Sequence, residues 1–269
     1  MKQDSRTSEP AGQQLRQWRE RRRLSQLQLA LEVEMSTRHL SFVETGRAQP
    51  SRDMIIRLAD HLDIPLRARN QILLAAGLAP EFEETGLTAP EMAEALAAVE
   101  HLLKAHEPFP ALAVDRHWNM VAANGALALL IEQIAPHLLV PPVNVLRLAL
   151  HPDGLAPQIV NYEVWRSYIL HRLDRDIEMT ADAGLAALRD ELAAYPGSAN
   201  DNAPAGRPPI ALPLTIDTVA GRLSFMTTVT IFGTPRDITL SELALETFFP
   251  ADAHTMQVLR SLDGGEALR

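Results

Sequence analysis

The residues best suited to recognition chemistry lie in one short stretch near the N-terminus of this 269-residue chain. They combine hydroxyl, guanidinium, imidazole and aromatic side chains: Ser36, Thr37, Arg38, His39, Ser41 and Phe42. An arginine can form two hydrogen bonds with guanine, a hydroxyl can donate or accept, and a ring edge can contact a thymine methyl. We therefore predict that Thr37, Arg38, Ser41 and Phe42 read DNA bases and that His39 contacts a phosphate.

Two serines place these residues on the second of two short helices. Ser25 and Ser36 each precede apolar residues at helical spacing, and serine is a favoured N-cap. Two helices that start about eleven residues apart around a tight corner have the spacing of a helix-turn-helix, whose second helix enters the major groove. Serine also caps many helices that bind nothing, and Arg38 and His39 would then belong to a solvated face.

The distribution of charge favours the DNA-binding interpretation. The whole chain has a net charge of −9, but residues 1–80 contain 13 Lys and Arg against 9 Asp and Glu. The remaining residues, 81–269, contain 12 basic against 25 acidic side chains. Basic charge therefore coincides with the predicted DNA-binding helices, whereas the rest of the chain is acidic and should repel DNA.

Several functional classes lack the residues that they require. The chain has no cysteine, so disulfides, thiolate metal sites and cysteine nucleophiles are absent, and its nine histidines show no paired metal-ligand spacing. Nucleophile-elbow, dinucleotide and phosphate-binding motifs are also missing, so we expect no enzyme, no catalytic residue and no metal or other cofactor. The polar N-terminus and the lack of a long apolar run predict a cytoplasmic protein without a membrane association.

The pattern along the chain predicts two domains. We expect a mobile N-terminus (1–12), an all-α DNA-binding domain (13–77), a linker with a connecting helix (78–107), an α+β domain (108–252) and a tail (253–269). Strands are predicted at 111–116, 120–124, 210–219, 222–232 and 237–248, with helices at 125–134, 158–174 and 180–194 and a loop at 196–209. They should form a five-stranded antiparallel sheet with helices on one face. The connecting helix, 90–106, could pack on this domain or on a partner subunit.

Apolar residues of the second domain could line a cavity between its helices and its sheet. The candidate ligand-binding residues are Trp118, Asn124, Asn144, Leu146, Arg147, Trp165, Phe225 and Phe232. The apolar members could equally be ordinary core, and the polar members could cap loops. Arg147 stands inside an apolar segment and must find an anion, which could be a ligand carboxylate or an internal Asp or Glu.

The N-terminal sequence resembles the lambda-repressor-like, Xre-type helix-turn-helix domain, from Ser25-Gln26 through Glu44-Thr45-Gly46-Arg47. The resemblance implies that Gln26 contacts a phosphate and that Arg47 lies near the DNA backbone. It also implies an internal ion pair between Arg19 and Glu44, so Glu44 should have a structural role.

The second domain resembles the MmyB-like ligand-binding domain of Xre regulators, in a PAS-like arrangement. The matching segments are residues 108–119, 141–152 and 223–240. This resemblance implies a one-component transcription regulator that accommodates a long-chain fatty acid or a similar apolar molecule.

One helix-turn-helix unit contacts few base pairs, so we expect a homodimer on an operator with two half-sites. The alternative is a helix-turn-helix protein that acts mainly through protein contacts, as an antitoxin or a scaffold, with a structural second domain. The arginines around the motif argue against that alternative because protein contacts would not require them.

Overall fold

The computed structural model describes residues 9–197, 212–233 and 235–263, and it divides into two compact units. The first unit contains the chain up to Glu84 together with two short segments, Glu178–Ala181 and Arg236–Ile238, and the second unit contains the rest. The break at Glu84 falls inside the predicted linker. Most of the predicted mobile N-terminus and of the 196–209 loop lies outside the described residues.

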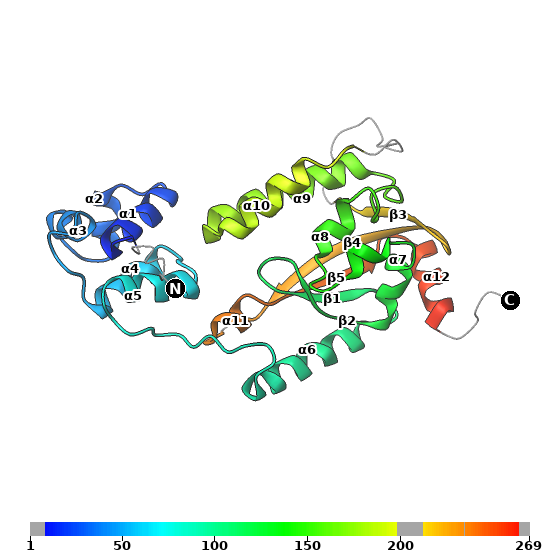
Figure 1. Cartoon of the computed structure of the whole chain (residues 1–269), viewed down its shortest axis with the longest axis horizontal. Helices are drawn as coiled ribbons and strands as arrows, with labels where there is room; N and C mark the ends of the chain where they lie inside the picture. The colour runs from blue at the N-terminus through cyan, green and yellow to red at the C-terminus, as the bar shows by residue number, and fades with distance from the viewer. Residues whose placement is uncertain (1–8, 198–211, 234, 264–269) are drawn as a thin grey trace, which may run out of the picture. The chain divides into compact units, whose positions relative to one another are not determined.

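The described part of the first unit up to Glu84 contains five helices, and serines cap three of them, including the predicted caps Ser25 and Ser36. These helices are α1 (Ala11–Arg21), α2 (Gln26–Glu32), α3 (Thr37–Glu44), α4 (Arg52–His61) and α5 (Leu66–Ala75) (Figure 1). The hydroxyls of Ser25, Ser36 and Ser51 each accept a backbone N–H in the first turn of the helix that follows. Such a bond satisfies an amide that the helix itself leaves without a partner.

The corner between α2 and α3 is closed by the backbone. Glu34 adopts a left-handed conformation with φ of 54°, and the amide of Met35 donates to the carbonyl of Ala30. A left-handed residue at this position ends α2, and glycine is the residue that usually occupies such a position. Gly77 (φ 75°) ends α5 in the same way, with the amide of Leu78 donating to the carbonyl of Leu73.

Helices α1 and α3 touch at the backbone. A Cβ atom added to Gly12 would lie 2.0 Å from the carbonyl oxygen of Val43, so a side chain at position 12 would push the two helices apart. Leu15 of α1 and Leu40 and Val43 of α3 are almost completely buried in the same core. The inner face of α3 is therefore fixed, and its other face is directed to solvent.

The second unit is built on a five-stranded antiparallel sheet, which confirms the predicted α+β fold. The strands are β1 (Ala111–Val114), β2 (Met120–Ala123), β3 (Leu214–Thr218), β4 (Gly221–Ile231) and β5 (Ala244–Pro250). Their order across the sheet is β2-β1-β5-β4-β3, so the first hairpin lies beside the last strand. The side chains at 244, 246 and 248 face one side of the sheet, because side chains alternate along a strand.

Helices cover both faces of this sheet, although we predicted helices on one face only. On one side lie α7 (Ala128–Ile131), α8 (Val145–Leu150), α9 (Tyr162–Thr180) and α10 (Ala183–Ala193) (Figure 1). On the other side, α6 (Ala93–Ala105) packs Val99 and Leu103 against Ala111 and Leu245. Because α6 contacts this sheet, the predicted connecting helix packs on its own domain.

Short 3₁₀ turns complete the second unit. They are η1 (Pro90–Met92), which leads into α6, η2 (Gly125–Leu127) and η3 (Pro136–Leu139). Two further predictions differ from the structure. The predicted strand at 237–248 begins with a helix, α11 (Ile238–Ser241), because the pairing of β5 with β4 starts only at Ala244. The predicted tail contains α12 (Ala253–Asp263), whose Thr255 and Leu259 are buried.

Candidate functional site

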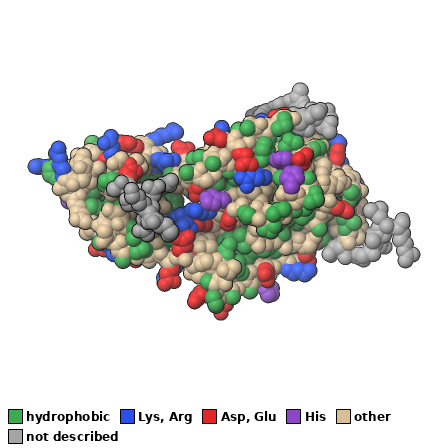
Figure 2. Space-filling model, in the orientation of Figure 1, with side chains coloured by type: hydrophobic (Ala, Val, Ile, Leu, Met, Phe, Trp, Pro, Cys, Tyr) green, Lys and Arg blue, Asp and Glu red, His purple; other side chains and the backbone are tan. Residues whose placement is uncertain are grey.

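The exposed face of α3 presents the predicted base-reading side chains together. Arg38 is exposed, and Thr37, Ser41 and Phe42 are partly exposed. The Cζ atoms of Arg38 and Arg47 lie 5.3 Å and 6.0 Å from the centre of the Phe42 ring. Two cations thus flank one aromatic ring on this surface, and arginine side chains are visible on the first unit in Figure 2.

Two predicted DNA-binding residues also serve the fold of this surface. The hydroxyl of Ser36 accepts the amide of His39, which fixes the first turn of α3. The side-chain amide of Gln26 donates to Glu44 Oε2 at 2.8 Å. Gln26 is therefore held beside the C-terminal end of α3, at the N-terminal end of its own helix, where a DNA phosphate would be favoured.

The predicted internal pair of Arg19 and Glu44 is present. Arg19 Nε and Nη2 donate to Glu44 Oε1 and Oε2 at 2.7 Å and 2.9 Å, and Arg19 Nη1 donates to the carbonyl of Leu24 at 2.7 Å. Both side chains are buried. Glu44 therefore connects α3 to α1, which is the structural role predicted for it.

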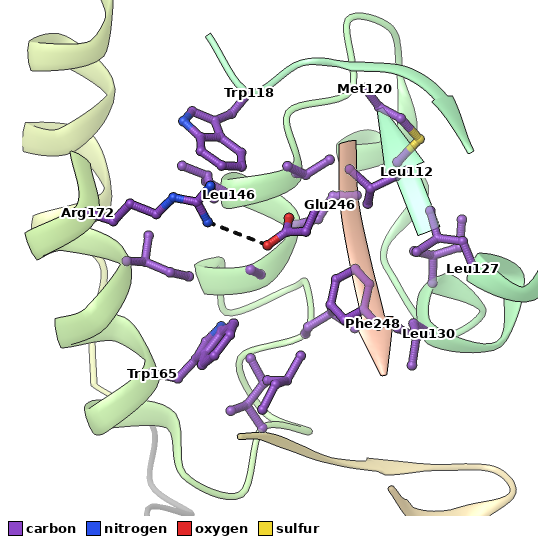
Figure 3. Close-up of a pocket in the computed structure, with 18 of the residues that line it drawn as sticks. Leu112, Trp118, Met120, Leu127, Leu130, Leu146, Trp165, Arg172, Glu246 and Phe248 are labelled. Carbon is purple, nitrogen blue, oxygen red and sulfur yellow. Dashed lines mark ion pairs between the residues drawn. The ribbon is translucent and has the colours of Figure 1, made fainter. Parts of the chain in front are cut away.

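A cavity in the second unit lies between the helices α7 to α9 and the sheet (Figure 3). About 70 Å³ of it can be occupied by the centres of water-sized molecules. This is several times the roughly 10–15 Å³ that one buried water requires. Its wall is mostly aliphatic and aromatic, with Leu112, Leu127, Leu130, Leu146, Leu148, Trp118, Trp165 and Phe248 among its members. Such a space favours an apolar molecule over water.

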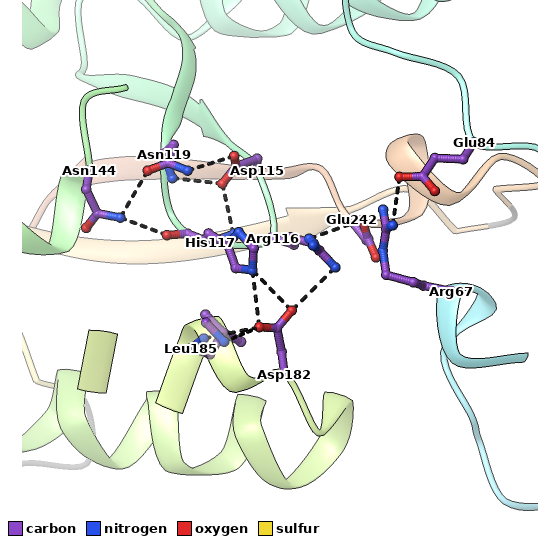
Figure 4. Close-up of polar contacts among 11 residues, drawn as sticks. Arg67, Glu84, Asp115, Arg116, His117, Asn119, Asn144, Asp182, Leu185 and Glu242 are labelled. Atoms are coloured by element: carbon purple, nitrogen blue, oxygen red, sulfur yellow. Dashed lines mark hydrogen bonds and ion pairs between the residues drawn. The ribbon is translucent and has the colours of Figure 1, made fainter. Parts of the chain in front are cut away.

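Three of the predicted ligand-binding residues line this cavity: Trp118, Leu146 and Trp165. Trp118 reaches it from the turn between β1 and β2, where its φ of 65° is left-handed. Asp115 holds this turn by accepting the amides of His117 and Asn119 at 2.8 Å and 2.9 Å (Figure 4). The turn therefore presents Trp118 to the cavity in a fixed orientation.

The same turn is bound to the start of α10. His117 Nε2 lies 3.1 Å from Asp182 Oδ2, and Arg116 Nη1 lies 3.4 Å from the same oxygen (Figure 4). Burial raises the pKa of Asp182, but hydrogen bonds from the amides of Gly184 and Leu185 and the nearby His117 outweigh it, so its pKa lies below the ordinary range. An ionised Asp182 thus connects the turn that carries Trp118 to the start of α10.

The predicted polar ligand-binding residues lie outside the cavity lining. Asn124 donates to the carbonyls of Leu103 and Phe109, and Asn144 caps α8 by accepting the amide of Arg147. Arg147 itself forms two hydrogen bonds with Glu191 at 2.7 Å and 2.8 Å. The anion that Arg147 requires is thus an internal glutamate, the second of the two possibilities.

Two predicted phenylalanines also lie elsewhere. Phe225 packs edge-on against Phe248, with ring centres 6.1 Å apart, in the core beside the cavity. Phe232 packs on the opposite side of the sheet with Val99 and Leu103 of α6. Both contribute to the packing of the domain.

The charged residues of the cavity are Arg172 and Glu246, neither of which was predicted from the sequence. Arg172 is in phase with the apolar positions Trp165 and Ile169 on α9, and Glu246 alternates with Ala244 and Phe248 on β5. Each of these charged residues continues a series of inward-facing apolar positions, and this pattern was the sequence signal that could have identified them. Arg172 Nη1 lies 3.6 Å from Glu246 Oε1, and its Cζ lies 4.1 Å from the Trp118 ring centre.

The described residues include one group that could hold a metal ion, although we predicted none. The ligand atoms of His137, His151 and Asp153 lie within 4.8 Å of one another. His151 Nδ1, however, already accepts the amide of Asp153 at 3.0 Å. None of these residues lines the cavity, and no described helix is long and apolar enough to cross a membrane.

Comparisons with known families agree with this division of the chain. Residues 11–72 match a helix-turn-helix domain family, and residues 96–262 match the MmyB-like transcription regulator ligand binding domain. A search of curated proteins finds no match. The second match covers more than half of the chain and includes every residue that lines the cavity. The chain therefore belongs to the MmyB-like family and is a DNA-binding transcription regulator with a helix-turn-helix domain followed by an MmyB-like ligand-binding domain.

Proposed function

We propose that this regulator reads a specific operator with α3 and senses a long-chain fatty acid or a related acyl molecule in the cavity of its second domain. The observation that carries the proposal is the apolar cavity, bounded by α8, α9 and the sheet. Aliphatic side chains and two tryptophans form most of its wall. Burying an alkyl chain there is favourable by about 0.8 kcal/mol per methylene group.

The geometry of α3 supports specific DNA binding. Among the described residues, the guanidinium of Arg38 contacts the Phe42 ring and forms no hydrogen bond or ion pair. Its hydrogen-bond donors are therefore available to a base. Arg47 lies just beyond Gly46, at the end of the helix, where a cation can approach the DNA backbone.

The proposed assembly on DNA is a homodimer. A single recognition helix reads only a few base pairs, and two helices placed about one turn of DNA apart give a longer site. An operator with two related half-sites follows from this symmetry. A protein that protects a single half-site and remains monomeric on DNA would contradict the proposed dimer.

Ligand binding should change the affinity for DNA. A ligand that binds one geometry of the dimer more tightly shifts the population toward it, and typical couplings are about 1–3 kcal/mol. The test uses full-length protein stripped of lipid and an operator selected from random DNA. DNA affinity is measured by fluorescence anisotropy with and without palmitic acid.

We expect palmitic acid to change the DNA affinity by about 5- to 150-fold. A variant that fills the cavity, Ala149→Phe, is the control and should show no response. An unchanged DNA affinity while palmitic acid is demonstrably bound would refute the sensor function. Failure to select any DNA sequence would instead favour a protein-binding role for the helix-turn-helix domain.

A further inference from the structure

The charged pair in the cavity wall joins α9 to the central strand β5. Arg172 and Glu246 are the charged residues among those that line the cavity, and their side chains are 16% and 11% exposed. In Figure 3 both side chains extend from opposite walls toward the same region, beside Trp118 and Leu146. The polar end of an otherwise apolar cavity is therefore at this pair.

This ion pair is incompletely hydrogen-bonded. The distance of 3.6 Å between Arg172 Nη1 and Glu246 Oε1 exceeds that of an ordinary hydrogen bond. Within the described residues the carboxylate of Glu246 has no other polar partner, and Arg172 stacks on the Trp118 ring. Buried charges without hydrogen bonds are unfavourable, so a ligand group that bonds to both side chains would be stabilised here.

We propose that Arg172 and Glu246 form the head-group site for a carboxylic acid, in which Arg172 binds the ligand carboxylate and Glu246, after taking up a proton, donates a hydrogen bond to it. This inference rests on the proposed function, because it assigns the polar end of the same ligand. The proton comes from solvent, and no covalent bond to carbon is made or broken. Arg172 changes its partner from Glu246 to the ligand.

The charges on the cavity wall require this proton. A ligand carboxylate beside an ionised Glu246 would place two anions on one guanidinium, whereas a neutral Glu246 leaves one cation with one anion. Burial raises the pKa of Glu246 and outweighs the opposing effect of Arg172. Glu246 therefore takes up a proton more readily than an exposed glutamate does. The cross-strand neighbours of Glu246 are Leu112 on β1 and Val229 on β4, neither of which titrates.

Other ionisable groups face Arg172 from its own helix. Asp176 lies one turn further along α9, where burial raises its pKa against the effects of Arg172 and Arg175. Tyr168 lines the cavity one turn before Arg172. Asp176 is the second carboxyl group that could take up the proton, and the experiment must distinguish it from Glu246.

The guanidinium favours a carboxylate over other lipid head groups. A carboxylate offers two coplanar oxygens that match the two parallel N–H donors of an arginine. An alcohol offers one neutral oxygen, which cannot replace the Glu246 carboxylate as the anionic partner of Arg172. We therefore expect the cavity to prefer a fatty acid to the fatty alcohol of equal length.

The experiment compares palmitic acid with hexadecanol on full-length, lipid-stripped protein, by titration calorimetry and by the fluorescence of the tryptophans. The wild type should bind the acid at least about tenfold more tightly, which is the value of one charge-assisted hydrogen bond. Arg172→Gln should abolish this preference. The matched control is Arg147→Gln, which removes an arginine of α8 that pairs with Glu191 outside the cavity lining. This variant should keep the preference for the acid over the alcohol.

Proton uptake gives a second measurement that needs no variant. Between about pH 6 and pH 9 the ligand is ionised, and above the pKa of Glu246 the affinity should fall by up to about tenfold per pH unit. Calorimetry in two buffers should then show one proton taken up. Glu246→Gln mimics the neutral acid, so it should retain acid binding without the pH dependence, whereas Asp176→Asn should retain the dependence.

The outcomes separate this inference from the proposed function. Equal binding of acid and alcohol by the wild type, or no proton uptake over that pH range, would overturn the head-group site and leave a lipid sensor. A pH dependence lost in Asp176→Asn and kept in Glu246→Gln would also overturn it. Failure of both probes to bind would overturn the proposed ligand as well.

Discussion

Removal of Arg19 should destabilise the DNA-binding domain more than any exposed substitution. Its guanidinium forms three hydrogen bonds of 2.7–2.9 Å, two to Glu44 and one to the carbonyl of Leu24. In Arg19→Met the carboxylate of Glu44 remains buried, with the Gln26 amide as its described side-chain partner. Removing one member of a buried ion pair costs about 3–5 kcal/mol.

A double variant tests this reasoning. In Arg19→Met with Glu44→Leu no buried charge remains, so the lost hydrogen bonds at Leu24 and Gln26 dominate, at about 1 kcal/mol each. The double variant should therefore lose about 2 kcal/mol, less than the single Arg19→Met variant. Total domain stabilities are only about 5–15 kcal/mol, so the difference is easily measured.

Hydrogen exchange is the suitable assay because it reports on this domain within the full-length chain. Peptides from α1 to α3 should exchange faster in the single variant, while peptides from the second domain should remain unchanged. The exchange rates give the free energy of unfolding. A loss of less than about 1 kcal/mol in Arg19→Met, or a double variant as unstable as the sum of both singles, would refute the reasoning.

Three further predictions concern DNA, ligand and pH. Arg38→Ala should lower operator affinity by about 1–3 kcal/mol and relax the preference at one base pair, whereas Arg47→Ala should weaken all sequences alike and reduce the salt dependence; competition binding at several salt concentrations distinguishes them. Ala149→Phe fills part of the cavity, so calorimetry should show weaker binding of palmitic acid by more than about tenfold, with an overpacking cost of about 1–3 kcal/mol in urea denaturation. The hydrogen bond from Arg147 lowers the pKa of Glu191 below its ordinary 4.5, so the stability that Glu191 provides is present above that pH and is lost as pH falls through the lowered value. Glu191→Gln should therefore lose less stability than the wild type between about pH 5 and pH 3, and an equal loss in both would contradict this assignment.

The helix-turn-helix was predictable from the sequence because local signals determine it. Ser25 and Ser36 each stand immediately before their helix, and both form the expected caps. The number of strands in the sheet and their antiparallel arrangement were also predictable, from the strand pattern and the resemblance. Such features depend on residues close together in the sequence, or on a hairpin between adjacent strands.

The polar end of the cavity was not predictable in the same way. Arg147 stands in an apolar segment, but this segment is helical, and the helix turns residue 147 away from Leu146 and Leu148, which line the cavity. Arg172 lies in the charged sequence His171 to Asp176, which resembles an exposed face. Only the pairing of α9 with β5 in three dimensions identifies Arg172 and Glu246 as partners.

The residues of α3 that pack in the core are different from the residues that it exposes to solvent. Leu40 and Val43 hold the helix in the domain, whereas Thr37, Arg38 and Ser41 contribute little to its core. If α3 reads the operator as proposed, mutations at these three outward positions should change the preferred DNA without loss of the fold. Under the proposed function, duplicated copies of the gene would acquire different target promoters while retaining the same ligand response. The same separation would allow a designer to direct the proposed sensor to a chosen promoter by exchanging only these side chains.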